Sequence, residues 1–189
     1  MWPWFAAGGL TTAAAVGGYL GLVTGAMPLD LGVGRRIRPL GPLTVDVAAP
    51  RDVVFDVIMA PYLERPARAM RDKVVVLERG ADLVLAAHRT PVGGRLVATT
   101  VETVRFVRPA EVHFTLVRGP VPHVVERFEL AEDGERTRLH YDGELGTDLW
   151  ALGRAWGNLV AARWEHTVAS SFDTIKAEAE RRAGPATRG

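Results

Sequence analysis

An amphipathic helical pattern runs along the chain from Leu149 to Ala183, near the C-terminus. This stretch contains no proline, and the Gly184-Pro185 pair that follows it is a typical helix stop. At helical spacing, one stripe of this stretch comprises Trp156, Val160, Trp164, Thr167, Val168, Ser171 and Ile175. The pattern predicts one helix about 50 Å long, and a helix of that length needs a large surface to pack against.

The residues before this helix alternate as strands do. Leu43–Val47 alternates apolar and polar positions, and Pro50 and Pro61 delimit a helix after it. A second short helix is expected from Tyr62 to Asp72. Six more strands are then predicted, at Lys73–Glu78, Leu83–Arg89, Arg95–Val107, Glu111–Arg118, Pro122–Leu130 and Thr137–Leu145. Because the turns between them are short, the sequence predicts an α+β domain in which a seven-stranded antiparallel sheet packs on the long helix.

The N-terminal stretch from Trp2 to Met27 carries no charged side chain. As a helix it would be about 39 Å long, which is enough to cross the hydrocarbon core of a bilayer. Trp2 and Trp4 occupy the position of interfacial aromatic residues, and Pro28 would end the span. We expect a transmembrane anchor; the alternatives are a cleaved signal peptide and a buried helix of a soluble protein.

The basic residues after the span predict its orientation. Arg35, Arg36 and Arg38 follow it, and no basic side chain precedes it. The positive-inside rule therefore places the following domain in the cytoplasm. The predicted organisation is a transmembrane anchor at residues 1–28, a juxtamembrane linker at 29–42, a folded domain at 43–184 and a tail at 185–189.

Small residues recur every four positions along the span. Gly17, Gly21 and Gly25 form a repeated GxxxG pattern, which allows two helix backbones to approach closely in lipid. One interpretation is a homodimer through this face. The other is chance spacing in a segment rich in glycine and alanine.

Composition excludes several classes of function. The net charge of +1 and the pI near 8.2 give no basic surface of the kind that binds nucleic acid. The chain has no cysteine, which excludes disulfides, thiolate catalysis and zinc–thiolate sites. Its five histidines lack the spacing of a metal site, and no glycine-rich nucleotide fingerprint follows a strand, so neither a metal nor a cofactor is expected.

Glu126 is the most informative single residue. In its strand, Val124, Phe128 and Leu130 share the apolar face, and alternation places Glu126 on the same face. Desolvation would raise the pKa of such a carboxyl, which suits a general acid or base or a ligand contact. The alternative is a structural carboxylate that pairs with an arginine or that a bulge turns outward.

Neighbouring strands and the long helix are expected to line the same space. For residues 111–118 two inward faces are possible, one with Val112, Phe114, Leu116 and Arg118 and the other with His113, Thr115 and Val117. The first is more apolar and would bring Arg118 near Glu126, and of His88 and Arg89 only one can point inward. The candidate ligand-binding residues are Phe114, Leu116, Arg118, Glu126, Phe128, Tyr141, Trp156, Val160 and Arg163, and Glu126 is also the candidate catalytic residue.

Two stretches and the closing helix resemble a known superfamily. Leu43–Ile58, LTVDVAAPRDVVFDVI, is similar to its opening strand and the helix after it, and Val124–Leu145, VVERFELAEDGERTRLHYDGEL, is similar to its last hairpin. On these residues the chain resembles the START-like superfamily (SRPBCC), of the polyketide cyclase/dehydrase and lipid-transport type. The resemblance implies the helix-grip fold, in which a curved sheet wraps around the long helix. It identifies a fold, which does not fix a function.

Three functions are compatible with these patterns. The leading hypothesis is a membrane-anchored protein that binds a hydrophobic small molecule, a lipid or a polyketide-like compound, between the sheet and the helix. The second is an enzyme of the cyclase or dehydratase kind, in which Glu126 or a histidine moves protons and Tyr141 or Arg118 stabilises developing charge. The third is an interaction scaffold without a usable cavity.

Overall fold

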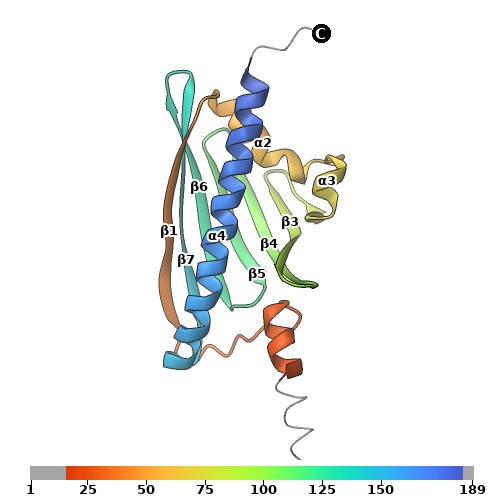
Figure 1. Ribbon diagram of the computed structural model, residues 1–189, viewed down its shortest axis with the longest axis vertical. Coiled ribbons are helices and arrows are strands. Elements are labelled where there is room, and N and C mark those ends of the chain that lie inside the picture. Colours follow the sequence, from red (N-terminus) through yellow and green to blue (C-terminus); the bar gives the residue numbers. More distant parts are fainter. Residues whose placement is uncertain (1–15, 185–189) are drawn as a thin grey trace, which may run out of the picture.

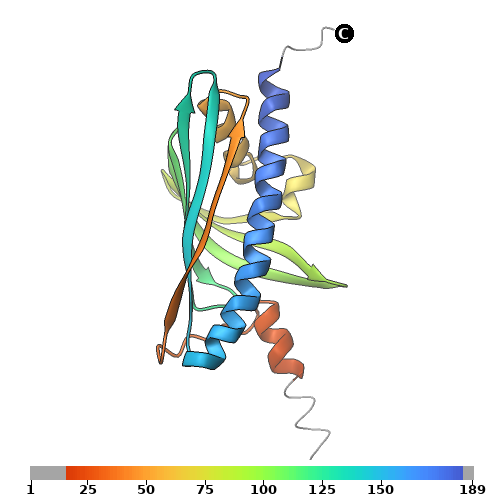
Figure 2. The ribbon, with the colours of Figure 1, turned by 60° about the vertical axis from the view of Figure 1, so that its left-hand side comes forward.

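The computed structural model describes residues 16–184. The elements are, in chain order, β1 (Arg36–Val47), α2 (Arg51–Met59), the 3-10 turn η1 (Ala60–Tyr62), α3 (Arg68–Arg71), β2 (Val74–Arg79), β3 (Leu83–Gly93), β4 (Leu96–Val107), β5 (Glu111–Arg118), β6 (His123–Asp133), β7 (Arg136–Thr147) and α4 (Trp150–Ala183). The seven strands form one antiparallel sheet in the order β1-β7-β6-β5-β4-β3-β2. Figures 1 and 2 show that the sheet curves around α4, which runs along its concave face. The prediction of a curved seven-stranded antiparallel sheet that packs on a long C-terminal helix is therefore confirmed.

The core lies between the concave face of the sheet and α4. On α4 the buried side chains include Val160, Val168 and Phe172. The Phe172 ring packs edge-on against Phe128 at 5.2 Å between ring centroids, and against Tyr141 at 6.4 Å. The predicted stripe was wrong at Ser171, which is exposed, because the helix turns Phe172 toward the sheet instead.

Strand β1 begins earlier than the alternation predicts. The predicted linker at 29–42 extends too far, because Arg36–Leu40 pair with β7, which reaches Thr147. The register shifts between Leu40 and Leu43, at Gly41-Pro42. This irregularity breaks the period-two pattern, and the predicted domain boundary at residue 43 was therefore too late.

The predicted span Trp2–Met27 lies partly outside the described residues, which begin at Val16. Within residues 16–184, no helix is both long enough and apolar enough to cross a membrane. A helix occupies residues 16–23, and Gly25 ends it with a left-handed backbone, φ +70°. A Cβ at Gly25 would lie 2.5 Å from the carbonyl oxygen of Thr99. Gly25 is therefore fixed by this turn and does not continue the helical face of Gly17 and Gly21, which corrects that part of the GxxxG prediction.

Residues 24–35, which we call the strap, cross one end of the sheet. Thr99 donates its amide to the carbonyl of Thr24 at 2.9 Å. Arg118 donates to the carbonyls of Gly25 at 3.1 Å and Ala26 at 2.9 Å. These bonds attach the strap to the ends of β4 and β5, and Figure 2 shows it continuing beneath the sheet toward the start of α4.

Asp148 fastens the far end of the strap. Its buried carboxylate accepts the amides of Leu31 at 2.7 Å and Gly32 at 2.8 Å, and it pairs with Arg35 at 2.8 Å. The hydrogen bond and charge of Arg35 lower the pKa of Asp148 below its usual range against the opposing effect of burial. The carboxylate is thus ionised at neutral pH, and in this form it holds the strap.

The start of α4 depends on the same segment. Leu149 and Trp150 both have left-handed backbones, with φ of 68° and 48°, which costs free energy for residues with side chains. Their amides donate to the carbonyls of Val33 at 2.8 Å and Gly34 at 3.1 Å. A side chain at Gly34 would overlap the Trp150 ring, so this contact requires glycine.

We expect Asp148→Asn to release the strap, because the variant loses the ion pair and leaves donors without a charged acceptor. The free energy of unfolding should fall by about 2–4 kcal/mol at pH 7, measured by urea denaturation. Trypsin should also cleave faster after Arg35 and Arg36. Asp30→Asn is the control, because Asp30 is an exposed partner of the same Arg35; equal effects of the two substitutions would contradict this role of Asp148.

Candidate functional site

Glu126 lies on β6 and points toward α4. Only 6% of the residue is exposed. The Tyr141 hydroxyl, from β7, donates to Glu126 Oε1 at 2.7 Å, and Trp164 Nε1, from α4, donates to the same oxygen at 2.6 Å. Gly143 lies directly opposite in the register, where a Cβ would approach the Glu126 side chain to 3.2 Å. Two strands and the long helix thus meet at one carboxyl group.

A second polar group lies on β4 and β3, which are two and three strands away from β6. Glu102 is buried, and Thr100 Oγ1 donates to its Oε1 at 2.6 Å. His88 Nδ1 lies 3.0 Å from Glu102 Oε2, at ion-pair distance but without hydrogen-bond alignment. The Tyr62 hydroxyl is 2.9 Å from His88 Nε2. Tyr62, His88, Glu102 and Thr100 therefore form a continuous polar chain beneath η1.

The two groups influence each other electrostatically. Burial raises the pKa of Glu126 to about 7, the Glu102 carboxylate adds to the increase, and the bonds from Tyr141 and Trp164 oppose it. Burial alone would raise the pKa of Glu102, but the charge and close contact of His88 and the hydrogen bond from Thr100 together outweigh it, and the pKa is lowered. Burial alone would lower the pKa of His88, but the charge and close contact of Glu102 and the charge of Glu126 together outweigh it, and the pKa is raised. Near neutral pH the interior thus holds one ion pair and one carboxyl group that gains and loses its proton.

Most of the predicted lining residues surround Glu126. Phe114, Phe128, Tyr141 and Val160 are buried, and Leu116 is partly buried against the same core. The Phe128 ring contacts Phe114 at 5.0 Å and Tyr141 at 5.8 Å between centroids. The inward face of β5 is therefore the one with Phe114 and Leu116, and the exposed Thr115 and Val117 lie on the outer face.

Three predicted site residues lie elsewhere. Arg118 was expected to pair with Glu126, but it is exposed and holds the strap, because the β4–β5 register shifts beside it and directs it to the end of the sheet. Arg163 is exposed on the outer side of α4. Trp156 is half-buried at the strapped end, where its Nε1 donates to the Pro120 carbonyl at 2.8 Å and its ring contacts Tyr19.

The sequence reasoning missed several members of the site. Trp164 was assigned only to the helix stripe, and Thr100, Glu102 and Tyr62 were not selected at all. Glu102 shares one face of β4 with the buried Ala98, Thr100 and Val104, but the sequence alone does not mark this face as inward, because the opposite face carries Val97 and Val101. Of His88 and Arg89, His88 is the one that points inward, and Arg89 is exposed. No local pattern marks Tyr62, because its hydroxyl meets His88 only through the tertiary fold.

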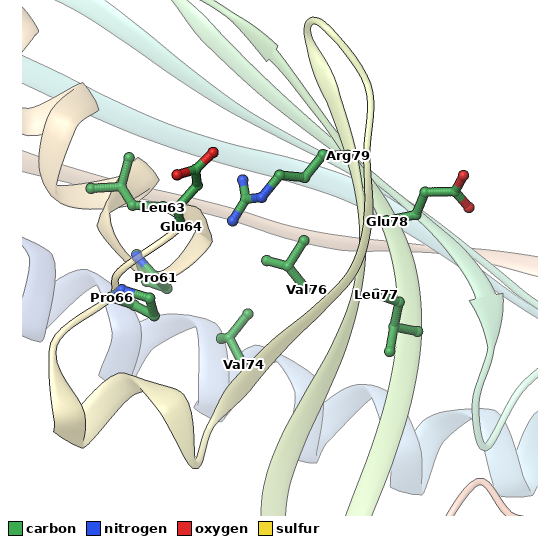
Figure 3. Close-up of a pocket in the computed structure, with 9 residues that line it drawn as sticks. All are labelled: Pro61, Leu63, Glu64, Pro66, Val74, Val76, Leu77, Glu78 and Arg79. Carbon is green, nitrogen blue, oxygen red and sulfur yellow. The ribbon is translucent and has the colours of Figure 1, made fainter.

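An external hollow lies close to the second polar group. It has a volume of about 420 Å³ and is lined by Pro61, Leu63, Glu64, Pro66, Val74, Val76, Leu77, Glu78 and Arg79. Figure 3 shows Val74, Val76 and Arg79 on the side of β2 that faces the 61–66 segment. Pro61 and Leu63 flank Tyr62, and Val74 pairs with His88 in the β2–β3 ladder. The hollow therefore adjoins the polar chain of Tyr62 and His88.

The site has the chemistry of proton transfer and hydrogen bonding. Burial and the nearby carboxylates raise the pKa values of Tyr62 and Tyr141, so both hydroxyls stay protonated and can donate. Both donors to Glu126 reach Oε1, and neither reaches Oε2. Within residues 16–184, no group of three histidine or acidic side chains is arranged to hold a metal ion. The arrangement suits a neutral ligand with a carbonyl or hydroxyl group.

We expect Glu126→Gln to stabilise the protein increasingly as pH rises. The pKa of Glu126 is about 7 when folded and near 4.5 when unfolded. Between these values the folded protein binds more protons, so its free energy of unfolding falls with rising pH, and the loss is complete above pH 7. Glutamine does not titrate and keeps an acceptor for Tyr141 and Trp164.

The advantage of the variant over the wild type should grow by on the order of 3 kcal/mol from pH 4.5 to 8, measured by urea unfolding. Glu129→Gln, on the outer face of the same strand, should show no such trend. A pH-independent difference between Glu126→Gln and the wild type would contradict the raised pKa.

Comparison with known proteins supports the fold. No protein-family model matches the chain, and no curated protein sequence matches it at a significant level. The Zhui aromatase/cyclase from Streptomyces sp. R1128 aligns with a TM-score of 0.66 and 21% identity, over 82% of this chain and 100% of that one. A norcoclaurine synthase point mutant from Thalictrum flavum aligns with a TM-score of 0.61 and 14% identity, over 80% and 99%. A START superfamily protein from Mycobacterium smegmatis aligns with a TM-score of 0.52 and 14% identity, over 77% and 97%. The chain therefore has a START-like, helix-grip fold.

Proposed function

We propose that this protein binds a hydrophobic small molecule, a lipid or a polyketide-like compound, between the sheet and α4. The observation that carries the proposal is Glu126, a buried carboxyl with a pKa of about 7 among aromatic side chains. An apolar ligand with one carbonyl or hydroxyl group would bury its skeleton against Phe114 and Phe128. Its oxygen would accept a hydrogen bond from protonated Glu126.

We place the access route at the hollow between the 61–66 segment and β2. The hollow has an apolar floor at Val74 and Val76 and adjoins Tyr62. Displacement of Tyr62 from His88 would join it to the interior. β2 is an edge strand, so the segment that faces it can move without breaking the sheet.

The membrane anchor is part of the same proposal. The part of the Trp2–Met27 stretch that precedes the strap would insert once, with the domain on the cytoplasmic side, because the arginines at 35, 36 and 38 all follow it. Such an anchor would hold the domain where hydrophobic ligands partition. A reporter fused after Gly189 tests the orientation, and activity only outside the cytoplasm would overturn it.

An enzyme of the cyclase or dehydratase kind is the second candidate. It is favoured by the coexistence of Glu126, which can donate a proton, and the Glu102 carboxylate of the His88–Glu102 pair, which can accept one. Among the proteins of similar fold are an aromatase/cyclase and norcoclaurine synthase. In such a reaction Glu126 would protonate an oxygen of the substrate while Tyr141 stabilises the developing charge.

The pH dependence of ligand affinity tests the role of Glu126. Prodan, a neutral fluorescent ketone, should bind more tightly below pH 7 than above it, because only the protonated carboxyl donates to the ketone. We expect the affinity to fall about tenfold across this range, as for the loss of one hydrogen bond in a buried site. Glu126→Gln, which always has a donor, should bind prodan with no pH dependence.

Glu129→Gln serves as the control, because it removes a carboxyl from the outer face of β6. If detergent is needed, all proteins are titrated in the same detergent, so that partition of the probe into micelles cancels. Wild-type affinity that is independent of pH would contradict the proposal. For the enzyme hypothesis, Glu126→Gln should abolish turnover while it keeps affinity, since an amide cannot transfer the proton.

A further inference from the structure

Exposed apolar side chains gather at the strapped end of the molecule. Six of them define what we call the apolar end: Tyr19, Leu20, Val97, Trp150, Leu152 and Leu159. Leu152 is 72% exposed, Leu159 60% and Trp150 54%, which is unusual for large apolar side chains in one region. Solvent exposure of this extent on an otherwise well-packed domain marks a surface that binds something apolar.

Contacts within the structure bring these side chains to the same end. The Tyr19 ring lies 6.4 Å from that of Trp156, which is one turn of α4 from both Leu152 and Leu159. The bond from Thr99 to Thr24 joins the strand that carries Val97 to the strap. Figures 1 and 2 place the helix over residues 16–23 at the end of the molecule opposite the C-terminus.

The charges around the apolar end are mainly basic. Arg36, Arg95 and Arg154 are exposed there. Of the acidic residues at this end, Asp148 and Asp30 both pair with Arg35, and Glu144 pairs with His123. The opposite end differs, because the turn between β6 and β7 carries charges of both signs and its side chains are exposed.

The chain itself also points to the occupant. Residues 1–15, which precede the described part at Val16, contain Trp2, Trp4 and Phe5 and no charged side chain. An apolar surface with basic side chains, continuous with such a segment, has the chemistry of a site for an anionic lipid bilayer. A protein partner would not require the basic side chains and the apolar N-terminal segment together.

We propose that the apolar end docks onto the surface of an anionic bilayer, with Leu152, Trp150 and Val97 in the interfacial region and the arginines among the headgroups. This inference rests on the membrane anchor of the proposed function and adds which face of the domain lies on the membrane. The strap lies at the membrane side, and the C-terminus of α4 points away from it.

The absence of cysteine makes a direct test possible, because a single introduced cysteine is the only labelling site. Leu152→Cys, Val97→Cys and, as the control at the opposite end, Glu135→Cys are labelled with an environment-sensitive NBD dye. The full-length chain is studied in vesicles of phosphatidylcholine with about one quarter phosphatidylglycerol. Emission should rise at least about threefold at positions 152 and 97 on binding, with quenching by nitroxide lipids, and should not change at 135.

Charge reversal tests the basic contribution. Arg95→Glu combined with Arg154→Glu should reduce the rise in emission at position 152 at least about threefold, whereas Arg136→Glu, at the opposite end, should leave it unchanged. An unchanged rise in the double variant would overturn the electrostatic part of the proposal. The prodan titration is run in parallel, so that ligand binding is judged independently.

Three results would overturn the docking proposal. If the protein sediments with vesicles but labels at 97 and 152 stay in water, the anchor holds and the docking face is wrong. If the protein does not sediment with vesicles, both the anchor and the docking are wrong. If the labels are already bright without lipid, the chain covers its own apolar end and no membrane is needed to explain it.

Discussion

The close approach of α4 to the end of β7 determines much of this structure. A side chain at Gly153 would collide with the Asp148 carbonyl, and a Cβ at Gly157 would lie 3.0 Å from Thr147 Cγ2. Glycine at both positions lets the helix start in direct contact with the strand. Farther along α4, large side chains fill the wider space, with Trp164 reaching Glu126 and Phe172 reaching Phe128. The polar site therefore lies where the curved sheet has moved away from the helix.

The pKa values of the two buried glutamates shift in opposite directions, because their surroundings differ. Glu102 has a histidine cation beside it, and the resulting attraction keeps it ionised despite burial. Glu126 has only the neutral donors Tyr141 and Trp164, which reduce the cost of its charge without removing it. The His88–Glu102 pair thus stays charged, while Glu126 titrates near neutrality. The interior can therefore gain or lose one proton, at Glu126.

The strap connects the N-terminal segment to the packing of the domain. Its carbonyls accept hydrogen bonds from the amides of Leu149 and Trp150, whose left-handed backbones begin α4. Its own amides donate to the carboxylate of Asp148. Without these partners, the strained junction between β7 and α4 would lose the bonds that stabilise it. The surface beside the strap is apolar and basic. The same end of the molecule therefore carries both the contacts of the strap with the domain and the proposed contact with lipid.

The sequence by itself determined the order of elements, the antiparallel sheet, the long closing helix and the inward direction of Glu126, because each follows from local periodicity and turn residues. The sequence did not determine the start of β1, because pairing with β7 overrides the break at Gly41-Pro42. Only the tertiary structure showed that Arg118 holds the strap, that Gly25 ends the helix over residues 16–23, that Tyr62 meets His88, and that Trp164 meets Glu126. These contacts join residues far apart in the chain, and periodicity carries no information about which distant residues meet.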